Sequence, residues 1–338
     1  MSLSEVSERE RERATAVRAV REACALCEAV AADMTGGAMR KPDRSPVTVA
    51  DLAGQALICR ALAEAFPTDP VMAEEDSSAL RQEALADQLE RIVHHVREFV
   101  PSAGTAQVLA WIDRGGLRTN ADRFWVLDPI DGTKGFLRGD QYAVALALVE
   151  DGRPVLAVLG CPRLSCPAGG AVNGTLFVAA RGGGATHRPL WRTDPPLPAR
   201  VSGTADILRA RMCEPLEPAH ASHGAAARLA QHLRMRRPPA RLDSQAKYGV
   251  VACGDGDVYL RLPRLPARFE NLWDHAAGAL LVQEAGGSVT DARGRPLDMS
   301  RGPALVANEG VLVTNGLLHA AVLEAIAELR LLDEAASA

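Results

Sequence analysis

The chain has 338 residues, of which 47% are hydrophobic and 24% are charged, and its formal net charge is −4. This length and hydrophobic content are sufficient to bury one large core or two smaller ones. The slightly acidic balance gives no support for a nucleic-acid-binding protein, because such proteins usually carry an excess of basic residues. We therefore expect no nucleic acid among the partners.

Nothing in the sequence indicates export or membrane insertion. Residues 1–21 are rich in Glu and Arg and lack the apolar stretch of a signal peptide. The longest apolar candidate, residues 142–159, is interrupted by the polar residues 150–154, so it predicts a hairpin rather than a membrane span. We predict a cytoplasmic protein, monomeric or homodimeric, without a membrane partner. Seven scattered cysteines argue against a disulfide framework, and the Cys24-x-x-Cys27 pair has no second pair to complete a zinc site.

The first part of the chain predicts a long helix and a buried strand. Residues 4–32 are rich in helix formers and are followed by Gly36-Gly37, which ends the helix. The remaining elements expected in this part are an extended segment at 45–49, a helix at 51–65, a strand at 71–73, a helix at 84–99 and a strand at 124–127.

The rest of the chain predicts alternating strands and helices. Residues 182–198 contain three glycines and four prolines, a composition typical of a domain linker. We expect an N-terminal α+β domain over residues 1–200 and a C-terminal α/β domain over residues 201–338. The expected elements are strands at 142–149, 155–159, 176–180 and 257–262, further apolar segments at 289–290 and 304–307, and helices at 225–233, 273–285 and 316–331.

The strongest chemical signal is a pair of carboxylates three residues apart, directly after the strand at 124–127. Asp128 and Asp131 are separated by a proline that fixes one backbone angle, and Gly132 allows the chain to turn sharply afterwards. This arrangement can direct both carboxylates and the Ile130 carbonyl to one point. Mg²⁺ prefers such an all-oxygen ligand set. A helix beginning near Thr133 would also offer free N–H groups to a phosphate.

Three further acidic positions have ordinary explanations when each is taken alone. Glu74 follows a short apolar strand, Asp51 opens a predicted helix, and Asp274 lies where a helix cap is expected. Their order along the chain, combined with the Asp128–Asp131 pair, favours one shared site.

This order resembles the Mg²⁺-dependent, lithium-sensitive phosphatase superfamily of inositol monophosphatase, fructose-1,6-bisphosphatase and 3′(2′),5′-bisphosphate nucleotidase. The matching segments are Glu74-Glu75, Asp128-Pro129-Ile130-Asp131-Gly132-Thr133, Trp273-Asp274-His275-Ala276-Ala277-Gly278 and Glu284-Ala285-Gly286-Gly287. A finer resemblance, to the bisphosphate nucleotidase branch, rests on residues 45–51, 132–136, 242–248 and 257–261. It implies an α/β protein folded as a layered αβαβα sandwich, with the site between its two halves.

The resemblance also implies residue roles. Glu74, Asp128, Asp131, Asp274 and the Ile130 carbonyl would hold two or three Mg²⁺ ions. Asp51 and Thr133 would be the catalytic pair that activates a water molecule, and the N–H groups of Gly132 and Thr133 would bind phosphate. Glu75 would either support these ligands or be solvated. The residues expected to contact substrate are His223, Ser244, Lys247 and Arg261, with ordinary surface charge as the alternative for the two cations.

The implied activity is hydrolysis of the 3′-phosphate of adenosine 3′,5′-bisphosphate, and of its sulfated relative, to give AMP and phosphate. Two alternatives remain open from the residues. One is a related phosphatase acting on an inositol phosphate, fructose bisphosphate or a phosphonucleoside of a specialised pathway. The other is a non-catalytic phosphonucleotide-binding sensor, which would be expected to have a broken metal site.

Overall fold

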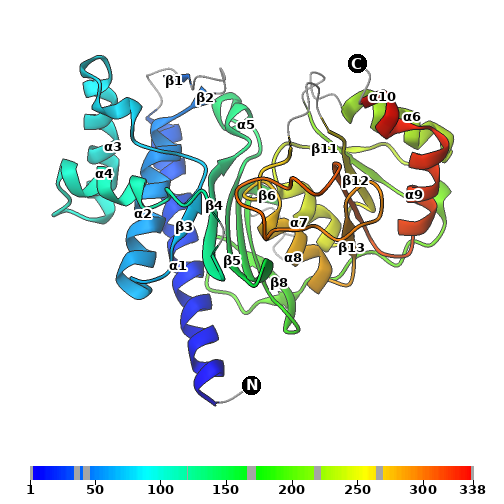
Figure 1. Ribbon diagram of the computed structural model, residues 1–338, viewed down its shortest axis with the longest axis horizontal. Coiled ribbons are helices and arrows are strands. Elements are labelled where there is room, and N and C mark those ends of the chain that lie inside the picture. Colours follow the sequence, from blue (N-terminus) through cyan, green and yellow to red (C-terminus); the bar gives the residue numbers. More distant parts are fainter. Residues whose placement is uncertain are drawn as a thin grey trace.

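Helical layers alternate with two β-sheets in the computed structural model, as Figure 1 shows. The structure describes residues 3–33, 39–40, 46–119, 121–165, 173–216, 222–263 and 269–335. Helices α1 to α4 cover the outer face of a seven-stranded sheet, α7 and α8 lie between the two sheets, and α6, α9 and α10 cover the five-stranded sheet. The predicted αβαβα sandwich is therefore confirmed.

The first helical layer packs on the seven-stranded sheet through one apolar core. The predicted long helix is confirmed as α1 (Leu3–Ala32), and α2 (Val49–Ala65) packs beside it with almost its whole surface buried. The sequence did not predict α4. The other elements of this layer are the hairpin of β1 (Met39–Arg40) and β2 (Pro46–Val47), the short 3-10 helices η1 (Ala79–Arg81) and η2 (Glu83–Leu85), α3 (Ala86–Phe99) and α4 (Thr105–Asp113).

The seven-stranded sheet has its strands in chain order, from β3 to β9. The first pair, β3 and β4, is parallel, and every later pair is antiparallel. The bounds are β3 (Val71–Ala73), β4 (Arg123–Asp131), β5 (Ala143–Glu150), β6 (Arg153–Ser165), β7 (Asn173–Ala180), β8 (Gly184–Pro189) and β9 (Leu197–Pro198).

Residues 182–198 are not a linker. They contain β8 and β9, which pair with each other and extend the sheet to its edge. Proline is tolerated there because an edge strand has backbone N–H groups that need no partner in the sheet. The composition therefore marks a sheet edge, and the division of the chain into two domains near residue 200 stays a prediction.

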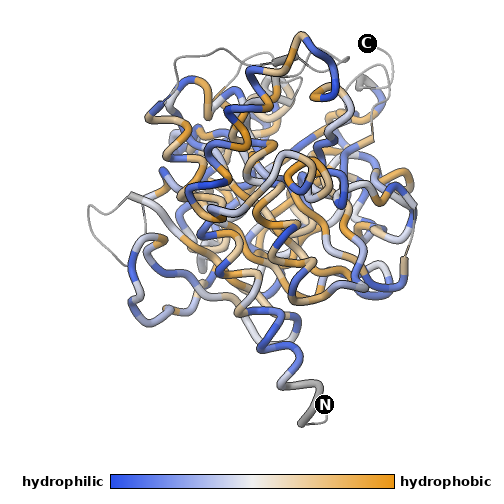
Figure 2. The backbone as a smooth tube through the Cα atoms, turned by 90° about the vertical axis from the view of Figure 1, so that its left-hand side faces the viewer, coloured by the Kyte–Doolittle hydropathy of each residue, from blue (hydrophilic) through white to orange (hydrophobic). Residues whose placement is uncertain are grey.

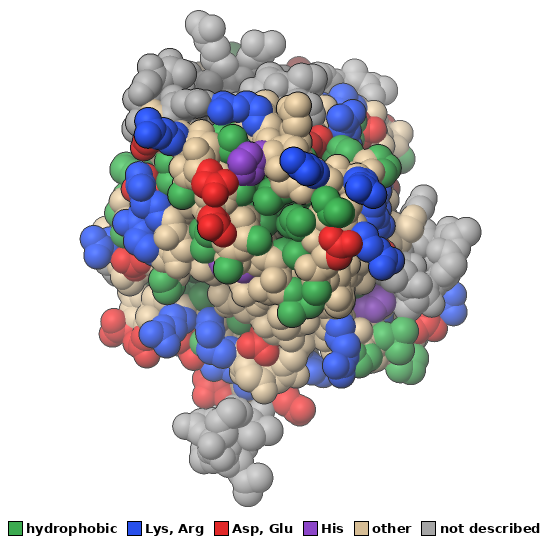
Figure 3. Space-filling view, turned by 90° about the vertical axis from the view of Figure 1, so that its right-hand side faces the viewer, with side chains coloured by type: hydrophobic (Ala, Val, Ile, Leu, Met, Phe, Trp, Pro, Cys, Tyr) green, Lys and Arg blue, Asp and Glu red, His purple; other side chains and the backbone are tan. Residues whose placement is uncertain are grey.

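The second half is built around a mixed five-stranded sheet in the order β11-β10-β12-β14-β13. Its outer face packs on α6 and α9 through a separate apolar core. The bounds are η3 (Ile207–Arg209), β10 (Met212–Glu214), α6 (Ser222–His232), β11 (Ala240–Arg241), α7 (Ala246–Ala252), β12 (Val258–Arg261), α8 (Ala276–Glu284), β13 (Ser288–Thr290), β14 (Val311–Thr314), α9 (His319–Glu328) and α10 (Leu331–Ala335). On the face of this half in Figure 3, basic and acidic side chains are interspersed around apolar ones.

Two sequence-based expectations for this half were wrong. The helix predicted from residue 273 begins at Ala276, so Asp274 precedes the N-cap residue His275 and does not cap the helix. The apolar segment at 304–307 forms only an isolated bridge, between Ala304 and Asn271, whereas β14 supplies the strand.

A partly buried ion-pair network holds α1 against the sheet. The guanidinium of Arg123 on β4 donates to Glu12 at 2.6 Å and to Asp69 at 3.0 Å. Beyond this anchor, α1 projects from the body of the molecule, and its coloured turns there are hydrophilic, as Figure 2 shows. Across the described ranges, helices that combine membrane-spanning length with sufficient apolarity are absent.

Cys24 and Cys27 on α1 are buried, and burial raises the pKa of both thiols, which indicates a packing role.

The core between the two sheets depends on the absence of one side chain. Gly278 on α8 faces the ring of Tyr248 on α7, and a Cβ atom at Gly278 would lie 2.4 Å from the Tyr248 Cγ atom. Both residues are buried. Because a packed core cannot accommodate such an overlap without moving a helix, glycine is required here for steric reasons.

Gly278→Ala is expected to destabilise the protein by about 1–3 kcal/mol, the usual effect of overpacking a core. Denaturant unfolding monitored by circular dichroism would measure the change. Gly224→Ala is the matched control, because Gly224 also lies in a helix but has no atoms near the added methyl group. That variant should gain stability, by at most about 1 kcal/mol, because alanine favours helices. Equal effects at both positions would contradict the steric explanation.

Candidate metal and phosphate site

The acidic pair on β4 lies within the strand, not beyond its end. β4 continues through Asp131, but its pairing with β5 shifts register between Asp128 and Asp131. In a regular strand, residues three apart point to opposite faces. The register shift changes this alternation, and the two carboxylates interact electrostatically.

Asp128 is at the centre of a cluster of carboxylates. Its side chain is buried, and its Oδ1 atom has no hydrogen-bond partner among the described residues. Burial raises the pKa of Asp128 well above its usual value, and the negative charges that raise it further are those of Glu74, Asp131, Asp274 and Asp51. The structure thus brings together all the carboxylates that the sequence assigned to metal and catalysis. Such a set is unfavourable without a neutralising cation, and its oxygen donors fit a hard divalent metal ion.

Asp131 is held between negative and positive neighbours. Burial, and then the charge of Asp274, raise the pKa of Asp131 to about 7, while the positive charges of Lys247 and Arg261 oppose the rise. The backbone N–H of Gln245 donates to Asp131 Oδ2 at 2.6 Å. One acidic residue of the first half is therefore bound directly by the second half.

Asp51 is fixed at the start of α2 by a capping box. Thr48 is the N-cap residue, and its backbone N–H donates to Asp51 Oδ2 at 2.7 Å. The other oxygen, Oδ1, accepts from the Thr133 hydroxyl at 3.3 Å. That hydroxyl lies equally far from the Ile130 carbonyl oxygen, at 3.3 Å. The predicted pairing of Asp51 with Thr133 is present in the structure.

The turn at Gly132 is in close contact with the second half. Gly132 has a φ of +88°, a conformation that glycine adopts most easily, and it is the N-cap of the short helix α5 (Thr133–Arg138). A Cβ atom at Gly132 would lie 3.1 Å from the Cβ of Ser244, which itself has a φ of +68°. The predicted phosphate-binding turn and the predicted substrate residue Ser244 are thus adjacent.

Two basic side chains from the second half reach the acidic cluster. Burial lowers the pKa of Lys247 to about 8, although the negative charge of Asp131 opposes this shift. Lys247 Nζ donates to the Leu242 carbonyl at 3.2 Å and lies 5.2 Å from the centre of the Tyr259 ring. Arg261 donates to Asp274 Oδ2 at 3.0 Å. These contacts distinguish both cations from ordinary solvated surface charges.

Of the remaining predicted residues, the structure describes the side chain of Glu75 but not that of His223. His223 lies in α6, but its side chain is outside the described residues. Glu75 is buried, with 5% of its surface exposed, so the solvated alternative for this residue is wrong.

Comparisons with known proteins agree with this arrangement. The family model described as "Inositol monophosphatase family" matches residues 3–331. The chain belongs to the inositol monophosphatase family.

Named relatives and solved structures of this family are similar over nearly the whole chain. A "3′(2′),5′-bisphosphate nucleotidase" of Oryza sativa is 43% identical, over 93% of this chain and 93% of that protein. A protein of the same name from Emericella nidulans is 41% identical, over 94% and 97% of the two chains. An IMPase structure from Thermotoga maritima has a TM-score of 0.64 at 22% identity and covers 92% of this chain and 95% of its own. At that identity the structural similarity supports the fold alone.

Two buried glutamines hold the acidic segments in place, and the sequence reasoning missed both. Gln55 on α2 donates to the Glu75 carbonyl at 2.7 Å and accepts from the Glu75 N–H at 3.1 Å. Gln245 donates to the Trp273 carbonyl at 2.8 Å and accepts from the Gly278 N–H at 3.0 Å, which fixes the segment carrying Asp274. A detectable signal was present for Gln55, which is a polar residue one helical turn after Asp51 in an otherwise apolar stripe.

Asp131→Asn is expected to stabilise the protein in the presence of a metal chelator. The unfolded chain titrates Asp131 near its ordinary pKa of 3.8, whereas the folded chain does so near 7. Between these values the folded chain binds more protons, so the free energy of unfolding falls as pH rises through that window. At about pH 8 the variant should exceed the wild type by about 1–3 kcal/mol, and near about pH 4 the difference should disappear. Denaturant unfolding across this pH range is the measurement.

Asp257→Asn is the matched control. Asp257 is buried, and its carboxylate accepts hydrogen bonds from the Ser202 hydroxyl and from the Arg211 N–H. The same substitution should therefore destabilise the protein at neutral pH. If Asp131→Asn also lost stability in chelator at this pH, repulsion would not dominate the cluster.

Proposed function

We propose that this chain is a Mg²⁺-dependent phosphatase that removes the 3′-phosphate of adenosine 3′,5′-bisphosphate to give AMP and phosphate. The sulfated relative of this nucleotide is a second proposed substrate. The observation that carries the proposal is the position of two basic side chains, Lys247 and Arg261, beside the acidic cluster around the buried Asp128. Cations held by the cluster would bind the phosphate group that is cleaved. The Lys247 and Arg261 side chains would bind a second phosphate group, which stays on the product. The names of the relatives from Oryza sativa and Emericella nidulans support this choice of substrate.

The proposed metal ligands supply only oxygen atoms. They would hold two or three Mg²⁺ ions, and the unpartnered Asp128 Oδ1 atom fits such a role. When bound, these ions would hold phosphate oxygens, offset negative charge in the transition state and lower the pKa of a water molecule. The ligands proposed are Glu74, Asp128, Asp131, Asp274 and the Ile130 carbonyl.

Asp51 and Thr133 are proposed to orient the attacking water. The carboxylate is held by Thr48, so it presents one fixed oxygen to the Thr133 hydroxyl. Because the Thr133 hydroxyl donates a hydrogen bond to Asp51, its oxygen is free to accept one from the water. This contact would direct the water in line with the phosphorus. The N–H groups of Gly132 and Thr133, at the start of α5, are proposed to bind the phosphate.

The second half is proposed to recognise the rest of the nucleotide. Lys247 and Arg261 would bind the phosphate that is retained, and Ser244 and His223 would make further contacts with the substrate. Assembly as a monomer or homodimer and a cytoplasmic location stay predictions.

Phosphate release should be rapid from adenosine 3′,5′-bisphosphate with Mg²⁺ and absent without it. Inositol 1-phosphate and fructose 1,6-bisphosphate should be hydrolysed much more slowly. Asp128→Ala should abolish turnover, because the cluster would lose its central ligand. A colorimetric phosphate assay measures all of these reactions.

Preferential turnover of another substrate would overturn the nucleotide assignment and favour the related phosphatase. Binding of the nucleotide without turnover of any substrate would favour the sensor, although the proposed carboxylates and Thr133 are all present in the chain.

The role proposed for Thr133 can be tested by two substitutions, one that removes the hydroxyl and one that keeps it. Thr133→Val keeps the shape but removes the hydroxyl, and kcat should fall by about 10²–10⁴-fold with little change in KM. Thr133→Ser keeps the hydroxyl and should retain most of the activity. Steady-state kinetics on adenosine 3′,5′-bisphosphate separate the two effects. A Thr133→Val enzyme as active as the serine variant would contradict the proposed role.

A further inference from the structure

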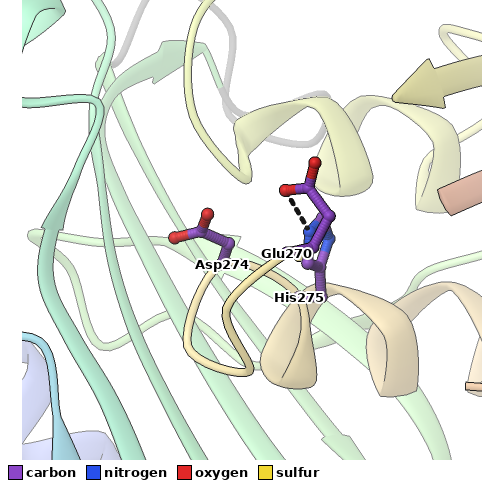
Figure 4. Close-up of side chains that lie close together, drawn as sticks. All are labelled: Glu270, Asp274 and His275. Carbon is purple, nitrogen blue, oxygen red and sulfur yellow. Dashed lines mark hydrogen bonds and ion pairs between the residues drawn. The ribbon is translucent and has the colours of Figure 1, made fainter. Parts of the chain in front are cut away.

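Glu270, Asp274 and His275 form a compact group at the border of the candidate site, as Figure 4 shows. Ligand atoms of the three side chains all lie within 4.8 Å of one another, a spacing that a metal ion could bridge. However, the carboxylate of Asp274 points away from the adjacent Glu270 and His275. The Arg261 guanidinium already pairs with both acidic groups, at 2.5 Å from Glu270 Oε2 and 3.0 Å from Asp274 Oδ2. This group is therefore better explained by the arginine than by a metal ion.

The contacts continue inward from Arg261 as a chain of hydrogen bonds. His275 Nε2 lies 3.3 Å from Glu270 Oε2, and His275 Nδ1 lies 2.6 Å from the Tyr248 hydroxyl oxygen. A carboxylate only accepts, so the Nε2 atom of His275 is the donor. In the neutral ring the Nδ1 atom then accepts from the Tyr248 hydroxyl. Each hydrogen bond thus fixes the orientation of the next group.

Protonation of the two terminal groups is consistent with this direction. Burial tends to raise the pKa of Glu270, but the charge of Arg261 and the hydrogen bond from His275 outweigh it and lower the pKa to about 2. Burial raises the pKa of Tyr248, so its hydroxyl keeps its proton. The chain therefore begins with a phenol that donates and ends with a carboxylate bound to a guanidinium.

The three inner residues of this hydrogen-bonded series are tightly packed, whereas Arg261 reaches solvent. Tyr248 is 1% exposed, His275 0% and Glu270 7%, but the Arg261 side chain is 25% exposed. The Tyr248 ring is held by Gly278 on one side and by an edge contact with Tyr259 at 5.4 Å on another. An arginine side chain loses conformational entropy when it binds a ligand. If a carboxylate fixed in the core already holds the guanidinium, less entropy is lost when the ligand binds.

We propose that Tyr248, His275 and Glu270 are positioning residues, which hold the Arg261 guanidinium ready for the substrate phosphate that is not cleaved. This inference rests on the proposed function, because it assumes that Arg261 binds that phosphate. The three residues do not touch the substrate themselves. They act on affinity through Arg261 and leave the reacting phosphate to the acidic cluster.

Glu270→Gln and Tyr248→Phe test the proposal with little change in volume, because the first removes the negative charge that pairs with Arg261 and the second removes the hydroxyl bonded to His275. With adenosine 3′,5′-bisphosphate, Glu270→Gln should raise KM about tenfold with little change in kcat, and Tyr248→Phe should do so less strongly. With adenosine 3′-monophosphate, which lacks the second phosphate, neither variant should differ from the wild type. Adding Glu270→Gln to Arg261→Ala should cause no further rise in KM, because the link would then have nothing to position.

His319→Gln is the matched control. His319 is hydrogen-bonded to two threonine hydroxyls, at 3.0 Å from Thr290 and 3.0 Å from Thr314, and these contacts do not involve Arg261. Its substitution should leave KM unchanged for both substrates. Equal effects of Glu270→Gln on the two substrates, or a fall in kcat alone, would overturn the positioning role.

Failure of the proposed function would be visible separately, as the absence of bisphosphate turnover by the wild-type enzyme. In that case, nuclear magnetic resonance of the arginine side chains still tests whether Glu270 holds Arg261. The Arg261 guanidinium signals should have the same chemical shifts in the wild type and in His319→Gln, and different ones in Glu270→Gln, because the ion pair with the carboxylate is lost. Unchanged Arg261 shifts in Glu270→Gln would contradict the proposal whatever the substrate is.

Discussion

Repulsion among carboxylates clustered around the buried Asp128 is the constraint on which the rest of this structure depends. Asp128 has lost the solvation of water, lies near four other acidic side chains and has one oxygen without a hydrogen-bond partner among the described residues. A protein designed for stability alone would replace it, because a buried charge without a counter-ion is strongly unfavourable. Its presence is understandable if the cluster serves to attract cations. The fold must then prevent the acidic segments from moving apart when no cation is bound.

Three different kinds of contact provide that resistance. The capping box at Thr48 holds Asp51, the Gln55 amide holds the backbone beside Glu74, and the Gln245 N–H holds Asp131. These contacts are local hydrogen bonds to uncharged groups, so they do not cancel the negative potential of the cluster. Among the described residues, the positive charges that act on Asp131 are those of Lys247 and Arg261, which belong to the second half. This separation of charge supports the proposal that cations bind on one side of the site and a phosphate group on the other.

The two halves are joined at the site by residues that have a role in both. Gln245 binds Asp131 of the first half through its backbone, and through its side chain it holds the segment before α8. The Arg138 side chain of α5 also pairs with Asp243, which lies two residues before Gln245 in the sequence. The apolar core between the sheets lies behind these polar contacts.

The parts of the site that could be predicted from sequence are those set by local chemistry. The Asp128–Thr133 segment contains its own proline and glycine, and Asp51 follows its capping threonine by three residues, so their conformations depend on near neighbours. The register shift in β4 depends on pairing with β5, and the sequence of β4 alone does not show it. Residues 182–198 read as a linker because edge strands tolerate the same residues as linkers, and β14 was missed because residues 304–307 are equally apolar.

The polar contacts that position the site were the hardest to predict, for one physical reason. Gln55 binds Glu75, and Tyr248 reaches Glu270 only through His275, so each partner lies about 20 residues or more away in the sequence. The periodicity of a helix or strand identifies which face is buried, but it does not identify which distant group will satisfy a polar side chain. A buried polar residue within an apolar face is nevertheless informative, because leaving it without a partner is unfavourable. In this chain, Gln55, Gln245 and His275 are such residues, and all of them connect to the acidic segments or to Arg261.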